Sequence, residues 1–578
     1  MSVCGLLINL DSDSSAAALV TGQSNRGRST LPDLTLPDTR TLRLYSVDAE
    51  GAYQSLSGYS IKCALGFPGT APRQKSVIGG SHFKPIVVGL GLSCLRKPIS
   101  RAIRLCSRFN PRMSDRPNIL WYCTDQQRFD TIGALGNPHV RTPTLDKLVA
   151  EGAAFTTAYC QSPICTPSRS SYMTGLYPSR VHNTRNGNDT FPQDAPPLIS
   201  KLLADAGYAC GMIGKFHLQS SGKRTEPRLD DGYSFWKFSH APRDDWDEGH
   251  DYAEWVRENG GDLDAMRESE ERVDPKYHQT TWASERALEF IGQERDGPWM
   301  LTINVYDPHP PFIPPKAYAD QFDPEKMPGP IFQESDLAQQ EKLREIDFQD
   351  DIRTPDEHDA QKRQALYYAM IAQIDDQFAR ILEALDANGQ AENTLIVFTS
   401  DHGETLGDHG LMFKGCRFYE GLVRVPLIFR WPGKIKSGLK SDALVELLDM
   451  SATMLDAAGV EIPEYFQGTS LLPIMRGETS PDHHRDTVRC EYFDSLDKHF
   501  TGGYGAFATM HRRGRYKLTV YHGKQLGELY DLESDPNEFN NLWDSEEHRN
   551  LKHELIHESF DQHVLLTTDV GSSRVAPM

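Results

Sequence analysis

The sequence predicts a layered α/β fold, in which a large mixed, mostly parallel sheet lies between helices and a smaller C-terminal α+β subdomain carries a short antiparallel sheet. Short apolar runs alternate with amphipathic helical segments from residue 117 to about residue 477. Residues of chemical interest directly follow several of these runs, as expected at the carboxyl ends of parallel strands. Beyond Gly477 the pattern changes to hairpin-like segments with Gly, Asp and Pro turns.

Composition indicates an ordinary globular protein. The chain has 578 residues, 38% of them apolar and 25% charged, which is enough for more than one core. Its 10 cysteines are dispersed without CxxC pairs, which argues against a disulfide scaffold or a zinc ribbon. The longest apolar run, near residues 85–95, is shorter than the ~20 residues that cross a bilayer. We therefore expect no membrane helix, and we expect no nucleic-acid partner.

Charge divides the chain into two parts. Residues 1–112 carry a net charge of +8, whereas the remainder carries −28. We interpret residues 1–112 as a poorly ordered or mis-annotated N-terminal extension, because they are rich in Ser, Gly and Arg and have few periodic apolar segments. Residues 113–477 are predicted to form the α/β domain and residues 478–578 the C-terminal subdomain. A start at Met113 predicts a cytoplasmic protein with free thiols, with export of the chain as the alternative.

The first element of the α/β domain is a buried parallel strand at residues 119–124. The strand ends at Asp125. Taken alone, Asp125 is expected to be a turn residue. Ligand sites in open α/β sheets, however, form at the carboxyl ends of strands, where Asp125 lies. A helix follows at residues 143–151. Thr142 is its expected N-cap, Pro143 lies in its first turn, and Gly152 closes it.

Three further helix–strand pairs follow along the chain. Helices are expected in residues 196–208, 284–293 and 361–390, and strands begin at residues 209, 299 and 394. The last strand ends at Asp401 and His402. Neighbouring side chains of a regular strand point to opposite faces, so these two converge only where the strand has become a loop. Gly403 is expected to give that turn its conformational freedom.

Several motifs stand in a consistent order. Cys165–Arg169 reads "CTPSR" and continues as "SSYMTGLYPSR". Taken alone, Cys165 is expected to be a small buried hydrophobe, an isolated lysine a surface residue, and a histidine between prolines a turn residue. The remaining motifs are "DQQR" from residue 125, "GKFHL" from 214, "DPHPPF" from 307, "SDHGETLGDHGLMFKG" from 400 and "GELYDLESDPNEFNNL" from 527.

Together these motifs make the chain resemble the formylglycine-dependent (type I) sulfatases of the alkaline phosphatase superfamily over roughly residues 117–542. The resemblance implies an alkaline phosphatase-like fold and a sulfuric ester hydrolase. It also implies that a maturing enzyme reads the flanking Pro167 and Arg169 and oxidises Cys165 to Cα-formylglycine. The hydrated aldehyde offers two hydroxyl groups, one of which attacks the sulfur while the other later expels sulfate.

The same resemblance assigns roles to other residues. It implies one divalent cation held by Asp125, Gln126, Asp401 and His402 together with residue 165. Calcium is favoured, because the ligands are rich in oxygen. Magnesium and manganese remain alternatives, since His402 supplies a nitrogen where many family members have asparagine. The implied contacts to the reacting groups are Arg169 to the diol or a sulfuryl oxygen, Lys215 and Lys414 to the sulfate oxygens, His217 to the second hydroxyl, His309 to the leaving group, and Asn186 to the substrate.

The sequence restricts the substrate less strongly. Residues 232–256 are dense in aromatic residues, and we interpret them as an insertion whose rings anchor a long loop, with sugar stacking as the alternative. The charge of −28 favours a mono-sulfated sugar, a chain end or an aryl sulfate over a densely sulfated polymer. Two other functions stay open. One is hydrolysis of phosphonate or phosphate mono- or diesters, and the other is binding of sulfated ligands by an unmatured thiol form.

Overall fold

The computed structural model describes residues 116–221, 225–246, 248–269, 272–496 and 505–568 and the backbone of four short strands nearer the N-terminus. The chain divides into two compact units, Met1–Cys94 and Leu95–Met578. In the first, β1 (Cys4–Ile8) pairs antiparallel with β2 (Ala18–Gly22), and β3 (Leu44–Val47) with β4 (Tyr53–Leu56). Apart from these backbone strands, the predicted N-terminal extension at residues 1–112 lies outside the described residues.

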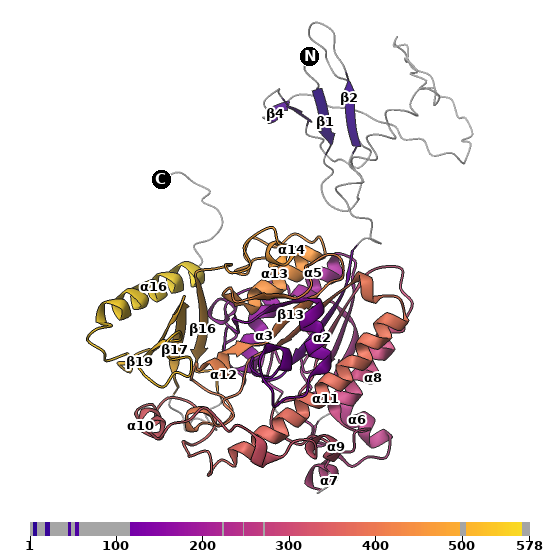
Figure 1. The fold of residues 1–578 in the computed structure, drawn as a ribbon. Coiled ribbons are helices and arrows are strands. Elements are labelled where there is room, and N and C mark those ends of the chain that lie inside the picture. The colour runs from indigo at the N-terminus through magenta and orange to yellow at the C-terminus, as the bar shows by residue number, and fades with distance from the viewer. Residues whose placement is uncertain are drawn as a thin grey trace, which may run out of the picture. The chain divides into compact units, whose positions relative to one another are not determined.

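An eight-stranded sheet forms the centre of the second unit (Figure 1). β13 runs antiparallel to its neighbours β6 and β11, and every other pair of neighbours is parallel. This arrangement confirms the predicted mixed, mostly parallel sheet. In spatial order the strands are β14 (Leu439–Ser441), β6 (Ala153–Phe155), β13 (Leu427–Arg430), β11 (Thr394–Ser400), β5 (Asn118–Thr124), β10 (Trp299–Asn304), β8 (Ala209–Gly214) and β9 (Tyr233–Phe238).

Helices bury both faces of this sheet. Along β5, Trp121 packs into one hydrophobic cluster and its neighbour Tyr122 into the other, as the two-residue period of a strand requires. The cluster around Trp121 includes residues of α3 (Cys165–Thr174), α5 (Ile199–Asp205) and α13 (Leu447–Ala457). The cluster around Tyr122 includes residues of α2 (Pro143–Glu151), α8 (Gln279–Ile291) and α11 (Ala360–Ala387).

Shorter elements connect these layers. A small three-stranded sheet joins β12, β7 and β15. The remaining bounds are η2 (Gly133–Leu135), β7 (Ala158–Tyr159), α4 (Pro178–Val181), α6 (Asp251–Glu258), α7 (Leu263–Glu268), α9 (Lys316–Ala319), η3 (Pro324–Lys326), α10 (Glu334–Lys342), η4 (Ala391–Asn393), η5 (Asp408–Gly410), α12 (Glu420–Val423), β12 (Arg424–Val425), β15 (Val445–Glu446) and α14 (Leu472–Arg476).

The C-terminal region forms the predicted short antiparallel sheet. Its four strands follow one another as β16 (Thr487–Phe493), β17 (Phe507–Arg513), β18 (Tyr516–Tyr521) and β19 (Leu526–Asp531), and α16 (Arg549–Thr567) packs against β17 and β18 (Figure 1). The predicted subdomain boundary at residues 477 and 478 directly follows α14.

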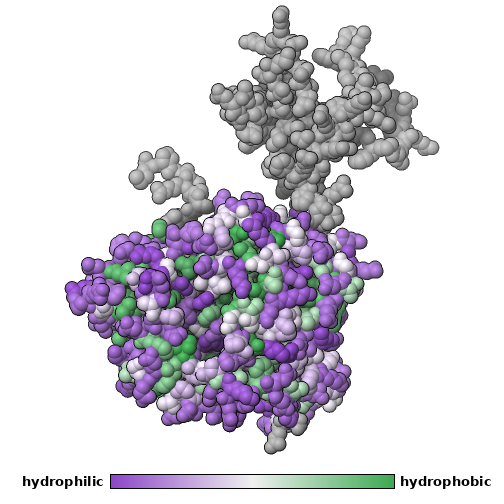
Figure 2. Space-filling view, viewed as in Figure 1, coloured by the Kyte–Doolittle hydropathy of each residue, from purple (hydrophilic) through white to green (hydrophobic). Residues whose placement is uncertain are grey.

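Hydrophilic residues predominate on the face of the molecule in Figure 2, with smaller hydrophobic areas between them. Within the described part of the chain, every helix is too short or too polar to span a bilayer.

One local prediction needs correction. The aromatic segment at residues 232–256 is not a loop insertion, because Tyr233–Phe238 forms β9 at the edge of the main sheet and α6 begins at Asp251.

Gly152 ends α2 as predicted, and its backbone is extended. A Cβ atom there would lie 2.1 Å from the carbonyl oxygen of Phe429, so close approach of a neighbouring strand requires the glycine.

Candidate active site

The candidate site lies beyond the carboxyl ends of three strands of the main sheet. Asp125 follows β5, Asp401 and His402 follow β11, and Lys215 follows β8. Cys165 faces them as the first residue of α3, and its side chain is buried. Parallel strands thus bring together residues that lie up to 277 positions apart, as the sequence pattern predicted.

Asp401 and His402 converge because β11 ends at Ser400. The expected reason for Gly403 is wrong, since the residue is needed for space rather than for backbone freedom. A Cβ atom on Gly403 would lie 2.0 Å from the carbonyl oxygen of Gly421. The Gly403 N–H donates to Leu422 O at 2.7 Å, so the turn packs closely against α12.

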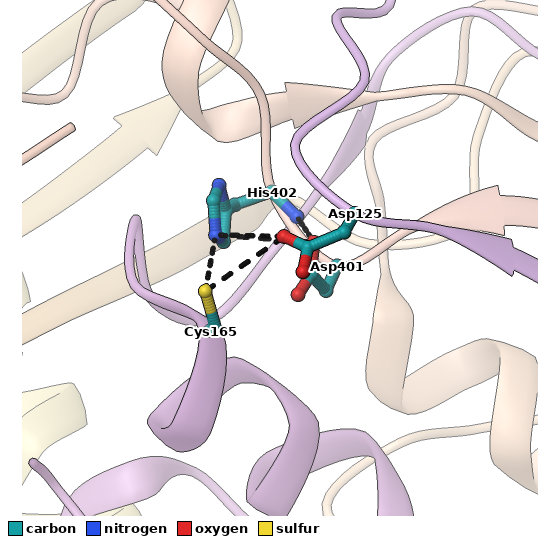
Figure 3. Close-up of side chains that lie close together, drawn as sticks. All are labelled: Asp125, Cys165, Asp401 and His402. Carbon is teal, nitrogen blue, oxygen red and sulfur yellow. Dashed lines mark hydrogen bonds and ion pairs between the residues drawn. The ribbon is translucent and has the colours of Figure 1, made fainter. Parts of the chain in front are cut away.

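Four buried side chains meet at one point (Figure 3). Ligand atoms of Asp125, Cys165, Asp401 and His402 all lie within 4.8 Å of one another. Cys165 Sγ is 3.2 Å from His402 Nε2 and 3.8 Å from Asp125 Oδ1. Two carboxylates, an imidazole and the side chain at position 165 make a donor set that fits a divalent cation.

The orientation of His402 supports the same fit. Its Nδ1–H donates to the Gly403 carbonyl at 2.9 Å, which leaves Nε2 facing the carboxylates and Cys165. A second hydrogen bond of this kind fixes the ring of a metal-binding histidine in many proteins. The cluster therefore matches the predicted metal ligands, with the exception of Gln126.

Gln126 belongs to a hydrogen-bond chain beside the cluster. Its side-chain Oε1 accepts from Lys414 Nζ at 2.8 Å, and its Nε2 donates to Glu404. The backbone N–H of Gln126, which has a φ of 70°, donates to Asp401 Oδ1 at 3.0 Å. Its role as a metal ligand stays a prediction, because its amide oxygen contacts an ammonium group here.

Two lysines place positive charge at Cys165. Lys414 Nζ lies 2.9 Å and Lys215 Nζ 3.5 Å from Sγ, and Lys215 also pairs with Asp125. Burial raises the pKa of the Cys165 thiol, but Lys215, Lys414 and His402 outweigh burial and hold that pKa well below its usual range. Negative charge on the side-chain atom of residue 165 is therefore stabilised.

The same cations act on Asp125. Burial and Cys165 raise the pKa of this carboxyl group, whereas Lys215, His309 and Arg169 outweigh them and lower it to about 2. Asp125 is therefore ionised across the physiological range, as a ligand of a cation must be.

Arg169 orients the carboxylates. Its Nε donates to Asp401 Oδ2 at 2.8 Å, one of its terminal nitrogens donates to Lys215 O at 2.9 Å, and the other lies 3.7 Å from Asp125 Oδ2. The guanidinium group is fully buried one helical turn beyond Cys165. These contacts are to carboxylates and backbone, so the expected contact of Arg169 with the diol or the substrate stays a prediction.

Two histidines border Cys165. Burial together with the Lys215 charge lowers the pKa of His217 to about 4, and interaction with Cys165 opposes this shift. The Nδ1–H of His309 donates to the Pro310 carbonyl at 2.6 Å. Burial and Lys414 hold the pKa of His309 below its usual value. Both imidazoles are thus placed to exchange protons with groups bound at position 165.

Asn186 lies at the start of α3 beside the cluster. Its Oδ1 accepts from the backbone N–H of Thr166 at 2.9 Å, which satisfies a donor of the first helical turn. This contact ties the loop of Asn186 to the segment that presents Cys165, and its predicted contact with substrate stays a prediction.

The sequence interpretation missed several neighbouring residues. Glu404 is fully buried and accepts hydrogen bonds from Gln126, Leu406 N and Phe413 N, so it holds the loop between His402 and Lys414. Its place two residues after His402 was the only available signal. His240 packs edge-on against His217, with ring centroids 4.7 Å apart. No motif marked it, since the segment around it was interpreted as an insertion.

Comparison with known families covers most of the described chain. The model of the family described as "Sulfatase" matches residues 117–460. The model described as "N-sulphoglucosamine sulphohydrolase, C-terminal" matches residues 407–564. The two matches together span the eight-stranded sheet and the C-terminal sheet.

Curated relatives cover about three quarters of the chain. An "Arylsulfatase" of Clostridium perfringens is 30% identical, over 75% of this chain and 92% of its own length. A "Multifunctional alkaline phosphatase superfamily protein" of Trinickia caryophylli is 31% identical, over 74% and 91%. An "N-acetylglucosamine-6-O-sulfatase" of Bacteroides thetaiotaomicron is 28% identical, over 80% and 89%.

A solved structure has the same fold. The phosphonate monoester hydrolase of Agrobacterium radiobacter superposes with a TM-score of 0.67 at 25% identity, covering 78% of this chain and 96% of that chain.

Proposed function

Because the chain belongs to the sulfatase family, we propose that this site hydrolyses sulfate esters of carbohydrates or aryl alcohols, with the side chain of residue 165 as nucleophile. The protein is a sulfuric ester hydrolase of the alkaline phosphatase superfamily. One observation carries the assignment of the site: Cys165 begins α3 in contact with Lys215, Lys414 and His402, beside two buried carboxylates. Such a site concentrates positive charge where a sulfuryl group and its attacking atom must meet.

Conversion of Cys165 to formylglycine supplies a hydrated aldehyde, whose oxygen replaces the thiol as nucleophile. The maturing enzyme that reads "CTPSR" must act before folding is complete, because Cys165 is 1% exposed and Arg169 is 1% exposed in the folded chain. Support for a maturase partner therefore comes from burial as well as from the motif.

A divalent cation bound among Asp125, Asp401, His402 and residue 165 supplies Lewis-acid polarisation of the sulfuryl oxygens. We favour calcium, because two of the four donors are carboxylates and hard cations prefer oxygen. The imidazole of His402 keeps magnesium and manganese as alternatives. Elemental analysis of purified protein distinguishes the three ions.

The remaining residues bind charge and move protons. Lys215 follows β8 and Lys414 lies in the loop after β11, and both side chains contact position 165. There they bind the sulfuryl oxygens. His217 is neutral near pH 7 and can accept a proton from a hydroxyl group at position 165. His309, held by the Pro310 carbonyl, delivers a proton to the leaving alcohol when it is in its protonated imidazolium form, a contribution typically worth about 10² to 10⁴ in rate.

A second candidate function is hydrolysis of phosphonate or phosphate mono- or diesters. The observations that favour it are the residue types at Gln126 and His402, together with the structural likeness to a phosphonate monoester hydrolase. The test is a parallel assay of wild-type enzyme with 4-nitrophenyl sulfate and a phenyl phosphonate ester. We expect faster turnover of the sulfate, and faster turnover of the phosphonate would reverse the order of the two functions.

An unmatured form would bind sulfated ligands without turning them over. In that case the peptide that contains residue 165 retains its thiol and no sulfate is released, whereas the matured enzyme has lost the sulfur. The mass of this peptide decides between the two.

We further propose a cytoplasmic location. The six cysteines that lie within the described residues are buried, unpaired thiols, which is typical of a reducing compartment. Fractionation of cells that express the native gene tests this, and recovery of the chain in an exported fraction would contradict it.

A further inference from the structure

A cleft of about 600 Å³ opens beside His309. His309 and Phe413 line it, and Phe413 directly precedes Lys414. His309 interacts with Cys165 and also lines the cleft, so its imidazole connects the nucleophile with the cleft. The alcohol that leaves with the proton from His309 can therefore occupy this cleft. The volume of the cleft is in the range of small-molecule sites.

The walls of the cleft combine an apolar floor with two cations. Phe312 and Leu366 contribute apolar surface beside Phe413. Lys362 and Arg363 come from the first turn of α11, and the Arg363 guanidinium carbon lies 5.9 Å from the centroid of the Phe413 ring. Apolar surface next to localised charge is typical of sites that fix the orientation of a small ligand.

Lys362 and Arg363 have no ion pair or hydrogen bond through their side chains within the described ranges, apart from the ring contact of Arg363. By contrast, Arg353, in the segment that precedes α11, pairs with Asp350 and Asp351. Asp359 is the single carboxylate on the cleft wall, and it forms no ion pair with either cation. The wall thus carries a net positive charge on a protein whose formal net charge is −20.

The cleft is connected rigidly to the catalytic loop. The backbone N–H of Gln349, on the cleft wall, donates to the carbonyl oxygen of Lys414 at 3.1 Å. An isolated bridge pairs the neighbouring Phe348 with Gly415. An alcohol held in the cleft is therefore positioned relative to Lys414 and His309 by hydrogen-bonded backbone.

We propose that this cleft binds the alcohol part of the substrate and that Lys362 and Arg363 bind a second anionic group on it, a carboxylate or a further sulfate ester. The inference rests on the proposed function and narrows its substrate class to dianionic sulfate esters. Net charge alone favoured a mono-sulfated substrate. The inference modifies that expectation, because the local electrostatic potential of the cleft is opposite in sign to that of the whole molecule.

The test compares two aryl sulfates of nearly equal shape, 3-sulfooxybenzoate and its neutral amide, 3-sulfooxybenzamide. We expect wild-type enzyme to show a higher kcat/KM for the carboxylate, by about two- to twentyfold, since each partly exposed charge pair contributes a factor of about 1.5 to 5. The advantage should shrink when salt is added. Glucosamine 6-sulfate and glucosamine 2-N,6-O-disulfate form the second arm, which separates preference for a carboxylate from preference for a second sulfate.

Two ratios of kcat/KM are compared, that of the carboxylate to the amide and that of the disulfate to the monosulfate. The double variant Lys362→Gln/Arg363→Gln should lower both ratios to about one. Lys147→Gln is the matched control, because Lys147 is an exposed cation of α2 outside the cleft, and it should leave both ratios as in the wild type. Thermal unfolding checks that the variants fold. Ratios near one in the wild type, or ratios that the double variant leaves unchanged, would overturn the inference while the sulfatase function stands. If the wild type hydrolyses neither aryl sulfate nor either sugar sulfate, the proposed function fails and the inference falls with it.

Discussion

The Nζ atom of Lys414 lies 2.9 Å from the Sγ atom of Cys165, although the two residues are 249 positions apart. The contact joins the start of α3 to the loop that follows β11. Gln126 Oε1 accepts a second hydrogen bond from the same ammonium group, which fixes the direction of the lysine side chain. The charge at residue 165 is therefore stabilised by a donor that is already oriented before substrate binds.

Replacement of Lys414 by methionine should lower kcat strongly. The variant keeps most of the buried volume but removes one oriented donor, and loss of one such donor typically costs about 10² to 10³ in kcat. Steady-state kinetics with 4-nitrophenyl sulfate measures the effect. Lys326→Met, at an exposed lysine that pairs with Asp323, is the control and should retain wild-type kcat. A loss of less than fivefold in Lys414→Met would contradict the role of this lysine.

Removal of the metal should abolish turnover reversibly. Enzyme dialysed against a chelator should regain activity on addition of calcium, and its melting temperature should rise with calcium because the folded state alone holds the cluster. Asp401→Asn should lose most of that thermal shift, whereas Asp320→Asn, at an exposed carboxylate paired with Lys316, should keep it. Equal calcium-induced shifts in both variants would argue against the four-residue cluster as the metal site.

The pairing of Arg169 with Asp401 predicts a large effect on stability. Arg169→Met leaves two buried carboxylates without their guanidinium partner, and breaking a buried pair typically costs about 3 to 5 kcal/mol. Urea denaturation of metal-free protein measures the free energy of unfolding. Arg141→Met, at a half-exposed pair with Asp376, should cost about 1 kcal/mol or less. Similar losses in the two variants would show that burial of the Arg169 pair is not the decisive factor.

Glu226 predicts how stability depends on pH. Its side chain accepts from Leu218 N and Ser221 Oγ beneath the His217 loop, and burial raises the pKa of its carboxyl group from 4.5 to about 7. Because the pKa is higher in the folded chain than in the unfolded chain, the protonated carboxyl group contributes stability that is fully present at pH values below the unfolded-state pKa. That contribution is lost as pH rises through about 7. The free energy of unfolding of the wild type should therefore fall from pH 5 to pH 8 relative to Glu226→Gln, by about 1 to 3 kcal/mol.

Chemical denaturation at the two pH values measures this difference. Glu341→Gln, at an exposed carboxylate of α10, should follow the wild type. If Glu226→Gln shows the same pH dependence as the wild type, Glu226 does not titrate in this range.

Four adjacent strands of the central sheet, β11, β5, β10 and β8, could be predicted from the sequence, whereas β14, β6, β13 and β9 were not predicted. The strands at β5, β8 and β11 are short buried runs between amphipathic helices, and their hydrophobic period is a local property. β9 was missed because an edge strand is buried on fewer sides, so its aromatic and charged residues lack the pattern of a core strand.

The candidate site was predictable in its residue types but not in its internal contacts. The sequence motifs named Asp125, Cys165, Asp401 and His402, and the structure brings these four together. The requirement for Gly403 comes from the carbonyl oxygen of Gly421, which approaches from a segment that no local pattern marks. In the same way, Asp401 lies 232 residues from its partner Arg169, and Glu404 lies 278 residues from its partner Gln126, so spacing alone could not reveal these two contacts.

The most direct test of the central claim is the mass of the peptide that contains residue 165, taken from purified protein with measured sulfatase activity. The account predicts that active protein carries an aldehyde at this position, so that the peptide is lighter by the difference between CH₂SH and CHO, and that activity rises in proportion to the converted fraction. Fully active protein with an intact thiol at residue 165, or full activity in Cys165→Ala, would contradict the account.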